Sequence, residues 1–215
     1  MEHEFWLNKW QQQQIGFHLS APHPLLQRYK DECFDSGPVF VPLCGKSLDM
    51  VFLAEQGHKV LGVELSETAV VSFFKERDLA IEKELANDLM AWRGGDYEIF
   101  QGDYFHLSSP ALEQTRQVYD RAALIALPKP MRESYVEHLE KIMPSDFRVL
   151  LITLDYHQDE MSGPPFAVSE QEVRHLYRNA REIKQLRYTS IIDQEPSFRE
   201  QGLTDLFQGT YFIQY

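Results

Sequence analysis

The segment from residue 39 to residue 77 constrains the fold most, because short apolar runs alternate there with amphipathic ones. The apolar runs are rich in β-branched residues and stop at polar residues, as buried parallel strands do. Soon after each run comes a serine that can cap a helix. The expected elements are strands at residues 39–43 and 59–64 and helices at residues 48–56 and 67–77. This strand–helix–strand–helix order predicts a doubly wound α/β sheet.

The rest of the chain extends this pattern. We expect strands at residues 97–101, 118–121 and 147–154, helices at 131–142 and 169–177, and a closing antiparallel pair at 182–193 and 206–215. Two short helices, at 4–14 and 25–32, precede the first strand. Because no internal repeat or Gly/Ser-rich linker divides the 215 residues, we expect a single domain over residues 1–215. Residues 1–36 would form a helical cover, and residues 37–215 would form the core.

Charge and hydropathy exclude several classes of protein. The chain has 21 Lys and Arg against 33 Asp and Glu, and its net charge of −12 disfavours nucleic acids and anionic membranes as partners. Mean hydropathy is −0.40, and no apolar run approaches the roughly 18 residues of a membrane span. The N-terminus lacks the order of a secretory signal, and two cysteines, Cys33 and Cys44, are too few for a zinc site. We therefore expect a cytoplasmic monomer that binds no metal.

The turn after the first strand is the expected place for a ligand. In open α/β sheets, ligands bind beyond the carboxyl ends of the strands. The sequence Gly45-Lys46-Ser47 there resembles the end of a phosphate-binding loop, and one alternative is a nucleotide-binding module that uses Lys46. That loop needs a glycine five positions before Gly45, where this chain has Phe40. The dinucleotide fingerprint with three glycines is missing as well, so a phosphate-bearing ligand is disfavoured.

Glu64 gives the second clue to the ligand. It ends the second expected strand, about 20 residues after the Gly45 turn, where an acidic side chain can bind both ribose hydroxyls of an adenosine group. The alternative is an exposed carboxylate favoured by the dipole of the following helix. A tight turn and an acidic strand end without a phosphate cradle point to an adenosine ligand without phosphates. S-adenosylmethionine is the obvious candidate, because its sulfonium cation suits an acidic protein.

Several segments resemble the thiopurine S-methyltransferase family, in its bacterial form. They occur in the family's order over nearly the whole chain, and the Pro-Leu-Cys-Gly-Lys segment is specific to this family and its close relatives. The matching segments are residues 6–10 with 16–18, 41–47, 62–66, 119–124, 163–166 and 202–203 with the aromatic C-terminus.

The resemblance implies the class I methyltransferase fold, Rossmann-like, with a mostly parallel seven-stranded sheet, an antiparallel C-terminal strand and an N-terminal helix over the cofactor. The implied reaction is methyl transfer from S-adenosylmethionine to small aromatic or heterocyclic thiols such as thiopurines, leaving S-adenosylhomocysteine. Alternatives on the same scaffold are methylation of selenium or tellurium oxyanion metabolites, thiocyanate or halide. A further alternative is a cofactor-binding regulator without turnover.

The resemblance also assigns a cofactor site. Trp10 would contact the cofactor and shield its sulfonium, or staple the N-terminal helix. The backbone of Leu43 would lie against the methionine moiety. Glu64 would bind the ribose, and Asp103 and Tyr104 would contact the adenine.

The resemblance places Arg121 beside both cofactor and acceptor. It could bind the cofactor carboxylate or favour the thiolate of the acceptor; the alternative is an ion pair with Asp120. Phe17, His18 and Phe166 are candidate walls of the acceptor pocket; for Phe17 and Phe166 the alternative is core packing.

One stretch departs from the family. Animal members carry a basic pair shortly before the glycine at the position of Gly202, whereas this chain has Pro-Ser-Phe-Arg-Glu over residues 196–200. Arg199 is therefore either a substitute for that pair or a solvated side chain. This difference leaves the preferred acceptor of the chain open.

Overall fold

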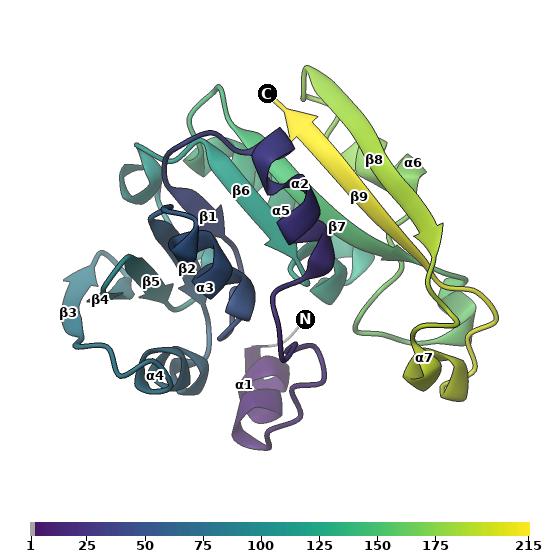
Figure 1. Ribbon diagram of the computed structural model, residues 1–215, viewed down its shortest axis with the longest axis horizontal. Helices are drawn as coiled ribbons and strands as arrows, with labels where there is room; N and C mark the ends of the chain where they lie inside the picture. Colours follow the sequence, from purple (N-terminus) through teal and green to yellow (C-terminus); the bar gives the residue numbers. More distant parts are fainter. Residues whose placement is uncertain (1–2) are drawn as a thin grey trace.

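A single nine-stranded sheet organises residues 3–215, the part of the chain that the computed structural model describes. Its strands lie in the order β3-β4-β5-β2-β1-β6-β7-β9-β8 (Figure 1). The strand bounds are β1 Val39–Val41, β2 Val60–Glu64, β3 Glu82–Ala86, β4 Leu89–Gly94, β5 Tyr97–Gln101, β6 Gln117–Arg121, β7 Arg148–Asp155, β8 Glu182–Ser190 and β9 Phe207–Gln214.

The five central strands β5-β2-β1-β6-β7 are parallel. Strands β2 to β5 all lie on one side of β1, and the chain then crosses to the other side of β1 with β6. The strand order therefore reverses between β1 and β6. In a doubly wound sheet, this reversal opens the crevice in which ligands bind.

Helices cover both faces of the sheet. One apolar cluster joins β1, β6 and β7 to α5 and α6, and a second one joins the opposite face to α2, α3 and α4. The helices are α1 His3–Gln11, α2 Pro24–Cys33, α3 Leu48–Glu55, α4 Glu67–Lys75, α5 Lys129–Ile142, α6 Glu170–Leu176 and α7 Pro196–Glu200. Helices α1 and α7 lie along the lower edge of the molecule in Figure 1, below the tips of the central strands.

Most of the expected elements are present, and the closing antiparallel pair is formed by β8 and β9. The α/β class with a parallel centre is confirmed. The first helix is shorter than expected and ends at Gln11. None of the helices within residues 3–215 combines the length and the hydrophobicity needed to cross a bilayer.

The expected strand count of seven is wrong, because a β3–β4 hairpin extends the sheet to nine strands. The sequence did not predict β3, because nearly all residues of this strand are exposed and three of them are charged. The strand consists of Glu82-Lys83-Glu84-Leu85-Ala86. Charged residues suit an edge strand because they discourage pairing with other chains. The hairpin turns through Asn87, whose φ of 54° fits the tight two-residue turn between Ala86 and Leu89.

Candidate active site

A cleft of about 870 Å³ lies at the carboxyl ends of the central strands and beneath α1. Its walls come from α1 and the loop after it, from the ends of β1, β2, β6 and β7, and from the segment around α7. The cleft brings together all the predicted site residues except Phe166: Trp10, Phe17, His18, Leu43, Glu64, Asp103, Tyr104 and Arg121. Its volume falls within the range of small-molecule sites.

Glu64 is a buried carboxylate at the end of β2, with only 6% of its surface exposed. One carboxylate oxygen accepts from the backbone N–H of Gly45 at 2.9 Å, and the other accepts from that of Ser66 at 2.7 Å. Burial raises the pKa of Glu64 to about 7, although these hydrogen bonds oppose the rise. The interpretation of Glu64 as an exposed carboxylate is wrong, because the side chain turns into the cleft rather than toward solvent.

Trp10 covers the Gly45 turn from above. The side chain is 6% exposed, and a Cβ added at Gly45 would lie 2.9 Å from Cζ2 of Trp10. Gly45 also has a φ of 53°, which favours glycine. The ring of Phe17 meets the indoles of Trp10 and Trp6 edge-on, at 5.6 Å and 5.7 Å, so two aromatic contacts join α1 to the loop after it.

Two residues without glycine's freedom adopt positive φ at the rim of the cleft. Leu43 has a φ of 48° after β1, and Ala122 has a φ of 63° after β6. Both line the cleft, at the two strands where the sheet order reverses. Backbone strain of this kind concentrates at binding sites. The sequence did not indicate the strain at Leu43 or at Ala122.

Arg121 forms its ion pair with Asp49, not with Asp120. Its Nε donates to Oδ2 of Asp49 at 2.9 Å, and one terminal nitrogen donates to the carbonyl of Phe17 at 3.2 Å. Asp120 lies on the other face of β6 and accepts from the hydroxyl of Tyr135 at 2.7 Å. The alternative of an ion pair with Asp120 is therefore wrong, because adjacent residues of a strand point to opposite faces.

Asp49 is a functional candidate that sequence reasoning missed. It is 1% exposed and accepts three hydrogen bonds: from Arg121, from the hydroxyl of Tyr119 at 3.1 Å and from the backbone N–H of His23 at 2.6 Å. It lies in the first turn of α3, where a carboxylate also favours the helix dipole. A carboxylate two residues after the Ser47 cap was the available signal.

Asp103 and Tyr104 follow β5, and the polar group of each has a partner within the protein. The carboxylate of Asp103 caps the 3₁₀ helix η1 (Tyr104–His106) and forms an ion pair with His3 at 3.1 Å. The hydroxyl of Tyr104 donates to the carbonyl of Tyr135 at 3.1 Å. Tyr104 therefore offers the cleft its ring rather than its hydroxyl.

His18 and Lys46 lie at the side of the cleft toward α4. Burial lowers the pKa of His18, and the nearby charges of Lys46 and Arg121 lower it further. The ammonium of Lys46 forms an ion pair with Glu76 at 2.6 Å. Lys46 is thus already neutralised, which disfavours the alternative of a nucleotide-binding module.

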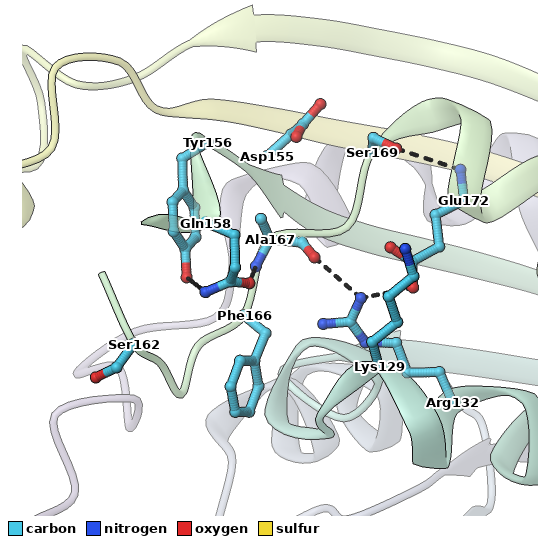
Figure 2. A pocket seen from close by; sticks show the side chains of 10 residues that line it. All are labelled: Lys129, Arg132, Asp155, Tyr156, Gln158, Ser162, Phe166, Ala167, Ser169 and Glu172. Carbon is cyan, nitrogen blue, oxygen red and sulfur yellow. Dashed lines mark hydrogen bonds and ion pairs between the residues drawn. The ribbon is translucent and has the colours of Figure 1, made fainter. Parts of the chain in front are cut away.

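Phe166 lies apart from the other predicted residues. It lines a second, smaller cavity of about 520 Å³, together with Arg132, Gln158 and Glu172. Figure 2 shows Phe166 beside Gln158, with the guanidinium of Arg132 bonded to the carbonyl of Ala167 and to Glu172. The neighbouring Pro164 and Pro165 line the large cleft instead.

The part of the cleft formed by β8, β9 and the residue before α2 was also missed. His23, Arg187 and Gln208 line it, whereas Arg199 forms an ion pair with Asp193 and is not among the lining residues. Burial lowers the pKa of His23 to about 4. Within the described part of the chain, no cluster of three or more His, Cys, Asp or Glu side chains could hold a metal ion.

Comparisons with known proteins agree with this architecture. The chain is 45% identical over 213 residues to a thiopurine S-methyltransferase of Shewanella pealeana, which covers 98% of this chain and 97% of the relative. It is 46% identical over 205 residues to one of Marinobacter nauticus, covering 94% of each.

Solved structures share the fold at low identity. A 1,6-didemethyltoxoflavin-N1-methyltransferase of Burkholderia thailandensis, solved with S-adenosylhomocysteine, superposes with a TM-score of 0.64 at 13% identity and covers 99% of this chain and 86% of its own. A methyltransferase of Anabaena variabilis that depends on S-adenosylmethionine has the same score and identity, with 99% and 94% covered. The family profile described as thiopurine S-methyltransferase matches residues 1–215. The chain therefore belongs to the thiopurine S-methyltransferase family.

Proposed function

We propose that this protein transfers the methyl group of S-adenosylmethionine to the sulfur of small aromatic or heterocyclic thiols such as thiopurines. The observation that carries the proposal is the buried carboxylate of Glu64 in a cleft at the sheet reversal, closed from above by Trp10. Membership of the family over the whole chain supports the same activity.

The cleft fits an adenosyl cofactor. A carboxylate buried as deeply as that of Glu64 needs hydrogen-bond donors, and the backbone N–H groups of Gly45 and Ser66 each donate to one of its oxygens. Since a carboxylate oxygen has two lone pairs, each can accept a ribose hydroxyl as well. Leu43 would lie against the methionine part, Asp103 and Tyr104 beside the adenine, and Trp10 over the sulfonium.

The cofactor supplies an activated methyl group, so the chain needs no strong general base. Its contribution is to hold donor and acceptor sulfur in line and to keep water out. Trp10 and Phe17 form the aromatic roof that excludes water. Arg121 lies under that roof, and its positive charge favours the thiolate form of an acceptor. Asp49 neutralises part of this charge and fixes the guanidinium in place.

We also propose how the protein exists in the cell: a cytoplasmic monomer, folded as one domain, with small molecules as its partners. The net charge of −12 supports a cationic cofactor and disfavours nucleic acids as substrates.

A competition assay tests the acceptor. Labelled S-adenosylmethionine is incubated with a thiopurine, thiocyanate, iodide and selenite, and the methylated products are separated. We expect the thiopurine to take most of the label. If it were the poorest acceptor, the assignment to aromatic thiols would be wrong. Absence of every methylated product would instead indicate a cofactor-binding regulator.

A further inference from the structure

Arg187 lines the cleft from strand β8, and a β-bulge sets its direction. In the β8–β9 ladder, Gln185 pairs with Tyr211 but Arg187 pairs with Thr210, so Leu186 is an extra residue. Without it, Arg187 would oppose Gly209 and point to the other face of the sheet. The bulge thus turns Arg187 toward the face that carries the cleft. Bulges near active sites commonly re-aim a side chain in this way.

Arg187 has no acidic partner. Of the two arginines that line the cleft, Arg121 is bound to Asp49, whereas Arg187 forms no ion pair with any residue within the described range 3–215. The side chain is exposed, and its Nε donates to Oγ1 of Thr189 at 3.0 Å. Glu195 lines the same cleft but lies beyond ion-pair distance. The terminal nitrogens of Arg187 are therefore available to a ligand.

The other groups nearby do not supply a competing charge. Lys46 is neutralised by Glu76. His23 is buried and holds the N-terminus of α2 by accepting from the backbone N–H of Leu25. Its other ring nitrogen contacts the amide of Gln208 at 3.4 Å. Lys9 lines the cleft from α1 and donates to the side-chain oxygen of Gln14, with no acidic partner within residues 3–215. Among the described residues that β8 and β9 contribute to the cleft, Arg187 is the one cation, and it is unpaired.

We propose that Arg187 determines acceptor specificity, and that it selects aromatic thiols that carry a carboxylate or another acidic substituent. The inference rests on the proposed function and names the acceptor class for the same cleft. A planar guanidinium binds a carboxylate through two parallel hydrogen bonds, a geometry that a neutral thiol cannot use.

The test compares thiophenol with its three carboxylated isomers, the ortho, meta and para mercaptobenzoates. Release of S-adenosylhomocysteine gives kcat and KM for each thiol at an alkaline pH that ionises all of them. We expect at least one mercaptobenzoate to exceed thiophenol in kcat/KM with the unaltered protein. In Arg187→Ala this advantage should fall roughly tenfold or more, mainly through KM, as expected for a lost charge-assisted hydrogen bond. Arg187→Lys should retain part of it, because it keeps the charge but not the fork.

Arg181→Ala is the matched control, because Arg181 is exposed, lies just before β8 and does not line the cleft. It removes the same charge and should leave all four thiols unaffected. An equal loss for thiophenol and for the mercaptobenzoates in Arg187→Ala would overturn the role of Arg187 while leaving methyl transfer in place. Failure of the unaltered protein to methylate any thiol would instead overturn the proposed function, and the acceptor class with it.

Discussion

The buried carboxylate of Glu64 accepts a backbone hydrogen bond at each of its two oxygens. Glutamine has the same shape, but its amide nitrogen would face the N–H of either Gly45 or Ser66, donor against donor. We expect Glu64→Gln to lower the free energy of unfolding by about 1–3 kcal/mol and to weaken S-adenosylhomocysteine binding at least tenfold. Thermal unfolding and titration calorimetry measure the two effects.

The control for that change is Glu82→Gln, which removes the same charge from the exposed edge strand β3. It should alter neither measurement appreciably. Unchanged cofactor binding in Glu64→Gln would remove Glu64 from the site.

The second prediction at the residue scale concerns the ion pair between Asp49 and Arg121. Asparagine at position 49 can accept through one oxygen only, so it must abandon either Arg121 or the backbone of His23. Breaking a buried ion pair from one side costs about 3–5 kcal/mol. We expect Asp49→Asn to destabilise the protein by about that amount and to reduce kcat/KM by tenfold or more. Chemical denaturation and steady-state kinetics provide the measurements.

A double-mutant cycle separates coupling from simple damage. If Asp49 acts by holding Arg121, the loss in Asp49→Asn should be much smaller when Arg121 is already glutamine. Additive losses would show that the two side chains act independently. The sequence indicated Arg121 but not its partner Asp49. The two side chains meet through the packing of α3 against β6, a tertiary contact that no local pattern records.

At the scale of elements, periodicity was sufficient for the parallel strands and their helices, since buried apolar runs and helix caps are local signals. The β3–β4 hairpin could not be predicted in this way. The outer strand of the hairpin, β3, has no apolar face. The pairing of β3 with β4 and of β4 with β5 follows from two tight turns at Asn87 and Gly95, and both residues have a positive φ. No sequence pattern indicated the bulge at Leu186 either, although the bulge decides toward which face of the sheet Arg187 points.

The cover formed by α1 gives a prediction about an element. In Gly45→Ala the new Cβ would lie 2.9 Å from the indole of Trp10, so the cover must shift. We expect faster protease cleavage between α1 and α2, a red-shifted tryptophan emission and weaker S-adenosylhomocysteine binding by tenfold or more.

Gly57→Ala is the matched control for the cover. Gly57 also has a positive φ, of 88°, but a Cβ there would meet nothing within 4 Å. Both variants strain the backbone, at a cost of about 1 kcal/mol, and only Gly45→Ala should loosen α1. Equal protease sensitivity in the two variants would mean that Trp10 does not anchor the cover.

At the scale of the whole molecule, buried ionisable groups link stability to pH in opposite directions. Burial raises the pKa of Glu64 to about 7 and that of Asp120 to about 6. The folded state then holds more protons than the unfolded chain, so these groups lower stability as pH rises from about 4 to about 7. Burial lowers the pKa of His23 to about 4, so His23 lowers stability as pH falls from about 6.5 toward 4. The contribution of His23 therefore offsets only part of that of the two carboxylates, and together the three groups lower the stability of the free protein as pH rises over this range.

Cofactor binding should change the pKa of Glu64 and make the affinity for the cofactor depend on pH. Ribose hydroxyls that donate to Glu64 stabilise its carboxylate form and lower its pKa, so binding releases a proton near neutral pH. We expect S-adenosylhomocysteine to bind more tightly, and to raise Tm more, at about pH 8 than at about pH 5. Calorimetry in two buffers of different ionisation enthalpy measures the proton released. Glu64→Gln should abolish this release and the pH dependence that comes with it, because it removes the carboxyl group that loses the proton. Equal affinity at both pH values in the unaltered protein would mean that the cofactor leaves Glu64 untouched, and the cleft would then hold its ligand through the roof and the strand ends alone.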